Sequence, residues 1–277
     1  MKLAVSNIAW PAALRDRAYA LLAANGIHGL EIAPGLFLNG ARDVFVPSGA
    51  EAEDAMSAAR AAGLELVSMQ SLLFGVQGAA LFGDGEARAR LDHAVLRAIG
   101  LARRLGIPNL VFGSPTQRVV PDTMPMAEAR SIAAETFRRL GDIAAAAGCR
   151  IAVEPNPAAY GTNFLNRVAE ALAFVEAVAH PAITLNFDVG ALHMNGDFST
   201  LEALAERAAP HISHVHFSEP GLAPAPADAG QARQVIAALT RIGYDGWYSI
   251  EMKAQPDDPL GALEQVIGRL LSAVEGG

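Results

Sequence analysis

The stretch AAAAGCRIAVEP, residues 144–155, contains the unit from which the fold of this 277-residue chain can be predicted. An alanine-rich segment with helical character ends at Gly148, and the apolar run Ile151-Ala152-Val153 follows it. Glycine adopts the left-handed conformation that closes a helix, and a buried parallel strand has a short, continuous apolar sequence. The stretch therefore predicts a helix, a turn and a buried strand, with Glu154 at the strand's end.

The same unit recurs along the rest of the chain. Alternating helices and strands favour a parallel sheet with helical crossovers, and eight such units fill a closed barrel. The rival doubly wound sheet usually carries a glycine-rich loop after its first strand, and SNIAWP at residues 6–11 is not one. We therefore predict one domain over residues 1–277, a single (β/α)8 TIM barrel of the α/β class. The predicted strands are 3–5, 30–32, 64–67, 110–112, 151–153, 183–187, 212–217 and 247–250, and the predicted helices are 11–25, 48–62, 84–105, 126–147, 164–179, 198–208, 228–242 and 258–274.

The composition limits the class of protein and the kinds of molecule that it is expected to bind. Hydrophobic residues make up 52% of the chain and charged residues 18%, which suits a folded domain with a large core. The formal net charge of −8 disfavours a nucleic-acid partner, which would require a basic surface. The N-terminus has no signal-peptide pattern, the single Cys149 allows no internal disulfide, and no apolar run is long enough to span a membrane. We expect a cytoplasmic protein.

Four consecutive predicted strands end in a side chain that can bind a metal: Glu154, Asp188, His216 and Glu251. They are separated by 34, 28 and 35 residues, each about one strand-helix unit, so a barrel places all four on its carboxyl-terminal face. Three carboxylates buried together repel one another, and a divalent cation relieves that repulsion. Three oxygens and one imidazole suit Mn²⁺ or Mg²⁺, with Co²⁺ and Zn²⁺ as alternatives. Any one of these residues alone would more often be a helix cap or a structural partner.

At these residues the sequence resembles the xylose isomerase-like barrel superfamily, the group of sugar phosphate isomerases and epimerases. The resemblance covers the whole chain in element order, and it implies metal binding by Glu154, Asp188, His216 and Glu251. In the ketose epimerases of this family, the glutamates that match Glu154 and Glu251 also move protons. Because barrels of this family often dimerise, the resemblance also implies a homodimer or a higher homo-oligomer. The matching stretches are Val153-Glu154-Pro155, Phe187-Asp188-Val189-Gly190, His214-Val215-His216-Phe217-Ser218-Glu219 and Ser249-Ile250-Glu251-Met252.

Three positions depart from the ketose epimerases. Ala191 stands where they have a histidine, with His193 as a candidate substitute; Leu222 stands where they have an arginine, and Tyr160 where they have a second glutamate. The resemblance therefore implies that the metal-binding residues match those of the ketose epimerases, whereas the residues that contact the substrate differ.

The expected substrate is a small carbohydrate: a sugar, a keto-sugar or a related polyol. In the predicted reaction the metal stabilises an enediolate, and Glu154 and Glu251 remove and return the proton, as in an isomerase or epimerase. The alternative on the same metal core is a lyase, either a dehydratase of the inosose type or an enzyme that cleaves a keto-glycoside.

Further residues are weaker candidates for contact with the substrate. Trp10, Gln70, Phe74 and Tyr160 lie on predicted loops, with ordinary loop packing as the alternative for each. Glu31 ends the second strand, where a structural ion pair is the alternative. His214 is expected one layer below His216, as a support for a ligand. His193 and Lys253 are candidates to donate hydrogen bonds to substrate oxygens.

Overall fold

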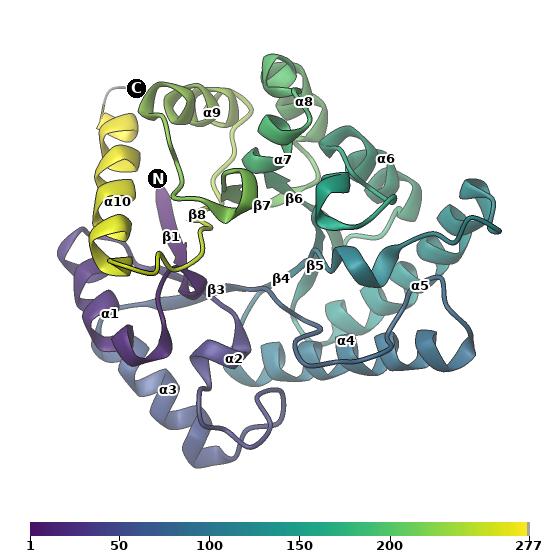
Figure 1. The fold of residues 1–277 in the computed structure, drawn as a ribbon, viewed down its shortest axis with the longest axis horizontal. Helices are drawn as coiled ribbons and strands as arrows, with labels where there is room; N and C mark the ends of the chain where they lie inside the picture. The colour runs from purple at the N-terminus through teal and green to yellow at the C-terminus, as the bar shows by residue number, and fades with distance from the viewer. Residues whose placement is uncertain (276–277) are drawn as a thin grey trace.

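A computed structural model describes residues 1–275 and shows a closed barrel of eight parallel strands in sequence order. The last strand pairs with the first, with Leu3 opposite Tyr248. The predicted TIM barrel is thereby confirmed, and the helices form a ring around the strands (Figure 1). The strands are β1 (Lys2–Ser6), β2 (Gly29–Ile32), β3 (Glu65–Met69), β4 (Asn109–Phe112), β5 (Arg150–Val153), β6 (Ile183–Asp188), β7 (Ile212–Phe217) and β8 (Trp247–Ile250).

The crossover helices lie close to the predicted segments. Two short helices, α2 (Pro34–Phe37) and α7 (Val189–Met194), were not predicted, because each is about one turn long and has no hydrophobic repeat of its own. Gly106 ends the helix before β4 with φ 72°, the left-handed conformation that the sequence pattern required. The crossover helices are α1 (Arg15–Ala24), α3 (Gly49–Ala61), α4 (Gly85–Leu105), α5 (Met126–Ala146), α6 (Val168–Val178), α8 (Leu201–Ala208), α9 (Ala229–Arg241) and α10 (Pro259–Glu275).

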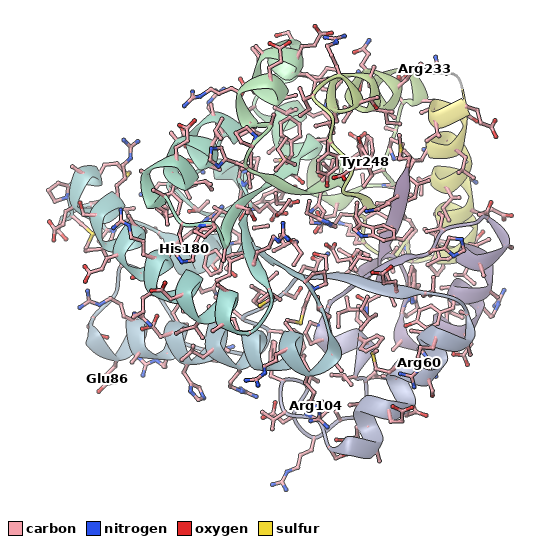
Figure 2. All side chains as sticks on the ribbon, turned by 180° about the vertical axis from the view of Figure 1, so that it is seen from behind. Arg60, Glu86, Arg104, His180, Arg233 and Tyr248 are labelled. Carbon is pink, nitrogen blue, oxygen red and sulfur yellow. The ribbon has the colours of Figure 1, made fainter. Side chains whose placement is uncertain are left out.

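The apolar core lies between the barrel wall and the helices. Phe137 of α5 packs edge-to-face against Phe112 of β4 and Phe174 of α6, with ring centroids 5.0 and 5.4 Å apart. Such aromatic pairs contribute about 0.5–1.5 kcal/mol beyond the area that they bury. On the outer side of the helices the charged side chains reach solvent, as Arg60, Glu86, Arg104 and Arg233 do in Figure 2, whereas Tyr248 lies buried at the barrel wall.

The barrel interior is polar, unlike the packed aliphatic interior common in this fold. Asn109 accepts a hydrogen bond from Ser213 at 2.9 Å and donates one to Ser68 at 3.0 Å, so polar side chains from β3, β4 and β7 satisfy one another. Buried polar groups are tolerated when they are hydrogen-bonded. Among the described residues, no helix combines the length and apolar character that a membrane span requires.

Candidate metal centre

The carboxyl ends of strands β5 to β8 bring Glu154, Asp188, His216 and Glu251 together. Each offers one donor atom, and these four atoms all lie within 4.8 Å of one another. Strand pairing sets this arrangement: Asp188 lies opposite His216 in the register of β6 and β7, and the backbone N–H of Glu251 donates to Phe217 at 2.8 Å. The four residues predicted as ligands therefore form one cluster.

The imidazole of His216 lies between this cluster and the barrel interior. Its Nδ1 is 3.0 Å from Glu154 Oε1, 3.4 Å from Glu251 Oε2 and 3.9 Å from Asp188 Oδ2. Its Nε2 is 3.0 Å from Glu31. A proton on Nε2 leaves the Nδ1 lone pair directed at the three carboxylates, which is the geometry of a histidine ligand supported by a second carboxylate.

Glu31 and His214 form a second, deeper layer of the site. His214 Nε2 lies 2.9 Å from Glu31 Oε2, and Gln70 donates a 2.9 Å hydrogen bond to the same carboxylate. Burial alone would raise the pKa of Glu31, but the neighbouring His216 and His214 outweigh it and hold that pKa well below its usual range. Glu31 therefore makes the ion pair that was the alternative to substrate contact, and its side chain is completely buried.

Asn156, Asn186 and Arg118 hold Glu154 in place, and sequence reasoning missed all three. The Asn156 and Asn186 amides donate to Glu154 Oε2 and Oε1, each at 2.9 Å. Arg118 donates to the Glu154 carbonyl oxygen and to Asn156 Oδ1, both at 2.8 Å. Asn186 lies two residues before Asp188 and so faces the same side of β6, a signal that could have identified it. Arg118 comes from the loop after β4, and nothing in its local sequence points to Glu154.

Asp188 has the least favourable electrostatic environment in the cluster. Burial, with the charges of Glu154 and Glu251, raises the pKa of Asp188 to about 8. Ser218 donates a 2.7 Å hydrogen bond to Asp188 Oδ2 and partly offsets this effect. A Cβ at Gly190 would lie 2.4 Å from Ser218 Oγ, so the glycine leaves room for this hydroxyl.

The cluster has the chemistry of a divalent cation site. Burial also raises the pKa of Glu251, and Glu154 adds to this rise. His216 has its pKa raised well above the usual range despite burial, because Glu31 and Glu251 face the ring. Excess negative charge at the barrel mouth therefore favours bound protons, which a divalent cation would displace. Three carboxylates and one imidazole fit such a cation, since oxygen-rich donor sets with a histidine suit Mn²⁺, Mg²⁺, Co²⁺ or Zn²⁺.

Two adjoining cavities open over this cluster. The first, the mouth lobe, has a volume of about 280 Å³ and is lined by Glu154, Asp188 and Glu251 together with Tyr160 and Leu222. The second, the outer lobe, has a volume of about 340 Å³ and lies on the side of strands β3 and β4. Glu154 lines both lobes, so a ligand in the mouth lobe borders the outer lobe directly. The outer lobe is lined by Gln70, Ser71, Leu73, Phe74, Val111, Gly113, Ser114, Pro115, Gln117 and Glu154.

The residues predicted to contact substrate lie in different surroundings. Tyr160 lines the mouth lobe, and Gln70 lines the outer lobe. Trp10 is 2% exposed and packs edge-on against Tyr19, outside both lobes. His193 stacks on Phe198 with ring centroids 4.7 Å apart and lines a separate, very small cavity. Lys253 is exposed and lines neither lobe.

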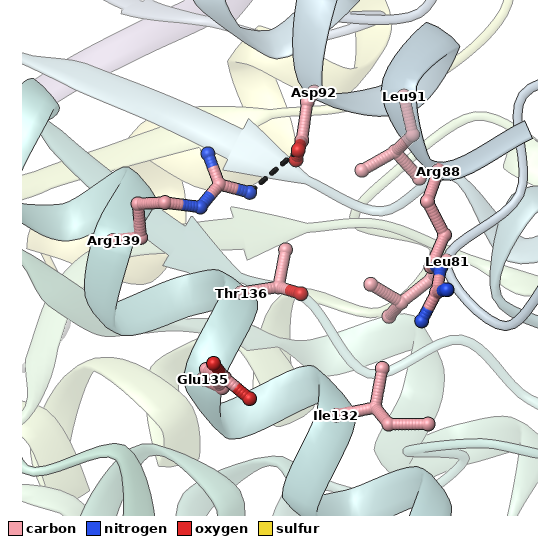
Figure 3. Close-up of a pocket in the computed structure, with 8 residues that line it drawn as sticks. All are labelled: Leu81, Arg88, Leu91, Asp92, Ile132, Glu135, Thr136 and Arg139. Carbon is pink, nitrogen blue, oxygen red and sulfur yellow. Dashed lines mark hydrogen bonds and ion pairs between the residues drawn. The ribbon is translucent and has the colours of Figure 1, made fainter. Parts of the chain in front are cut away.

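A further cavity of about 250 Å³ lies in the helical layer between α4 and α5 (Figure 3). Arg139 and Asp92 form a 2.6 Å ion pair across it, so these two charges satisfy each other. The residues predicted for the site do not line it, and it belongs to the contact between the two helices.

The chain matches one protein family, and its fold is similar to those of several solved structures. The model of the xylose isomerase-like TIM barrel family matches residues 19–272. No curated protein matches the chain in sequence.

Several solved structures share the fold at low sequence identity. A 3-keto-D-glucoside 4-epimerase from E. coli superposes with a TM-score of 0.79 at 16% identity, covering 98% of this chain and 99% of its own. A D-allulose 3-epimerase from Methylomonas sp. has a TM-score of 0.75 at 21% identity, covering 100% and 96%. A D-psicose 3-epimerase has a TM-score of 0.74 at 17% identity, covering 99% and 97%.

Proposed function

We propose that this chain, which belongs to the xylose isomerase-like TIM barrel family, is a divalent-metal-dependent isomerase or epimerase of a keto-sugar or related polyol. One observation carries the proposal: three carboxylates and one imidazole converge within 4.8 Å at the carboxyl ends of adjacent strands. In barrels of this fold, catalytic groups lie at that end. The mouth lobe above them leaves room for a small ligand in contact with the carboxylates.

Glu154, Asp188, His216 and Glu251 would hold the cation, with Mn²⁺ or Mg²⁺ preferred and Co²⁺ or Zn²⁺ as alternatives. When bound, it would polarise the carbonyl and hydroxyl oxygens of the substrate and so acidify the neighbouring C–H bond. Glu31 would keep a proton on His216 Nε2, because its carboxylate lies 3.0 Å from that nitrogen.

Glu154 and Glu251 would move the proton. Both carboxylates line the mouth lobe, so each can reach a carbon atom of a bound keto-sugar. One would remove the proton to leave an enediolate, and the other would return a proton from the opposite face. Amide hydrogen bonds at 2.9 Å fix both oxygens of Glu154, which gives that glutamate a set orientation.

The similar structures support this class of reaction. The proteins named above act, by their names, on 3-keto-D-glucosides, D-allulose or D-psicose. At identities of 16 to 21% these structures share the fold with this chain, and the substrate is part of the proposal.

The test combines metal analysis with hydrogen exchange. We expect about one divalent ion per purified chain, and incorporation of solvent deuterium beside the carbonyl of a keto-sugar without loss of water. Chelation should abolish the exchange, and the added metal should restore it. Elimination of water or of an alcohol in place of exchange would identify the lyase instead. A protein that binds no divalent ion and exchanges no proton with any ketose or keto-inositol would contradict the proposal.

A further inference from the structure

The outer lobe gives the site more room than the mouth lobe alone provides. Its volume is about 340 Å³, against about 280 Å³ for the mouth lobe. A keto-sugar ring whose reacting carbon lies beside Glu154 and Glu251 occupies the mouth lobe, because both carboxylates line it. The outer lobe then remains beside the ring, on the side of Glu154.

The lining of the outer lobe is uncharged apart from Glu154. Its polar groups are the hydroxyls of Ser71 and Ser114 and the amides of Gln70 and Gln117. Among residues 1–275, no lysine, arginine or histidine lines either lobe. A phosphate group is recognised by cationic side chains, which both lobes lack, and it would also be repelled by the carboxylates. Neutral hydroxyls and amides instead match the hydroxyl groups of an unphosphorylated sugar.

Phe74 provides a flat apolar surface at this lobe. Its side chain is 58% exposed, and it is the only aromatic residue among the large hydrophobic side chains exposed in residues 1–275. A Cβ at Gly35 would lie 2.9 Å from Phe74 Cε1, so the ring rests on the backbone of α2. An exposed but supported aromatic ring beside a polar cavity is suited to stack on the C–H face of a sugar.

The two loops that shape the lobe carry unusual backbone conformations. Ser71, directly after Gln70 on the loop following β3, has φ 57°, and Ser114 on the loop following β4 has φ 47°. Left-handed conformations are unfavourable for serine, and such strain concentrates at ligand sites. Gly113 adds room between the lobes, since a Cβ there would lie 2.5 Å from Glu154 Oε2.

We infer that the outer lobe binds a second, uncharged sugar ring, so that the substrate is a keto-sugar glycoside and Phe74 is the residue that selects it. This inference rests on the proposed function, because it assumes that the reacting ring lies in the mouth lobe. Phe74 touches the second ring and not the reacting carbon, so it determines specificity.

The test compares three probes: free 3-keto-glucose, the same sugar joined through its C1 oxygen to a second glucose, and 3-keto-glucose 6-phosphate. Affinities are measured by calorimetry on metal-loaded Glu251→Gln protein, which is designed not to turn over, and kcat/KM is measured on the unaltered protein. We expect the disaccharide to bind at least tenfold more tightly than the free sugar, and the phosphate to bind most weakly. Phe74→Ala should reduce the preference for the disaccharide about tenfold, which is the size of one aromatic contact.

Two variants control for an indirect effect. Phe74→Trp keeps an aromatic face and should retain the preference, whereas Leu96→Ala removes an exposed hydrophobic side chain of α4 and should not alter it. Equal affinity for the free sugar and the disaccharide, an undiminished preference in Phe74→Ala, or tightest binding of the phosphate would each overturn the inference. Tight, Phe74-dependent binding of the disaccharide without any proton exchange would instead leave the lobe assignment intact and contradict the proposed isomerase activity.

Discussion

Carboxylates face both ring nitrogens of His216, but their negative charge is balanced on only one side of the ring. On the mouth side, Glu154, Asp188 and Glu251 face Nδ1; on the interior side, Glu31 faces Nε2. The three carboxylates on the mouth side carry an excess of negative charge. Burial and the two glutamates raise the pKa of Asp188 to about 8. On the interior side one carboxylate lies against two imidazoles, and its pKa stays well below the usual range despite burial.

This difference shows that burial of a carboxylate does not by itself identify a reactive group. What matters is whether the neighbours balance its charge. On the interior side, the charge of Glu31 is balanced by His214 and His216 of the chain itself, and Glu31 is suited to orient His216. Glu154, Asp188 and Glu251 are left with an excess of negative charge, and they line the mouth lobe, where the proposed cation would bind. Substitutions on each side of His216 would test this division of roles.

The largest expected effect follows from Glu251→Gln. The amide keeps the size of the side chain and one oxygen donor but cannot accept the substrate proton, so kcat should fall by about 1,000-fold. Steady-state kinetics and the melting temperature would be measured together, with the exposed Glu264→Gln of α10 as the matched control. Activity within a few-fold of the unaltered protein would remove Glu251 from the reaction.

The substitution Glu31→Gln should weaken metal binding and not the proton transfer itself. Loss of the carboxylate leaves His216 Nε2 without its charged partner, and metal affinity should fall by about 10- to 100-fold. Competition with a chelator of known affinity measures this loss, and saturating metal should restore most of the activity. Glu65→Gln, at the exposed start of β3, is the matched control. Unchanged metal affinity would show that the two sides of His216 are not coupled.

Metal affinity should rise with pH. The pKa of Asp188 is raised to about 8, so below that pH a proton must leave before the carboxylate can bind a cation. Affinity should therefore increase by at least tenfold per pH unit below about pH 8, because the pKa values of His216 and Glu251 are also raised and their protons must leave as well. The same raised pKa makes the metal-free fold lose stability as pH rises toward 8, because its protonated form is the favoured one. Calorimetric titration with the metal would measure the affinity, and melting curves of the chelator-treated protein would measure the stability, both between pH 6 and 9. A metal affinity that does not change with pH would contradict an excess of negative charge at the site.

Ser218→Ala is expected to have the smallest effect. The variant removes the 2.7 Å hydrogen bond to Asp188 Oδ2 and leaves the carboxylate in place, so metal affinity should fall roughly fivefold. Ser131→Ala, on the exposed face of α5, is the matched control. A loss larger than that of Glu31→Gln would show that Asp188, and not His216, is the residue most dependent on its support.

The sequence by itself determined the barrel and the four residues of the cluster. The unit of helix, turn and strand is local, and a side chain that can bind a metal recurs where each of the last four strands ends, so periodicity along the chain was sufficient to find them. The short helices α2 and α7 could not be found in this way, because one turn carries no period.

Only the tertiary structure decided what surrounds those four residues. Glu31 and His216 are 185 residues apart in sequence, and Arg118 and Glu154 are 36 apart, yet both pairs are in direct contact. Whether a buried carboxylate meets an imidazole, an amide or another carboxylate depends on how the closed barrel turns each side chain. That outcome sets the charge balance of the site, and no local pattern in the sequence contains it.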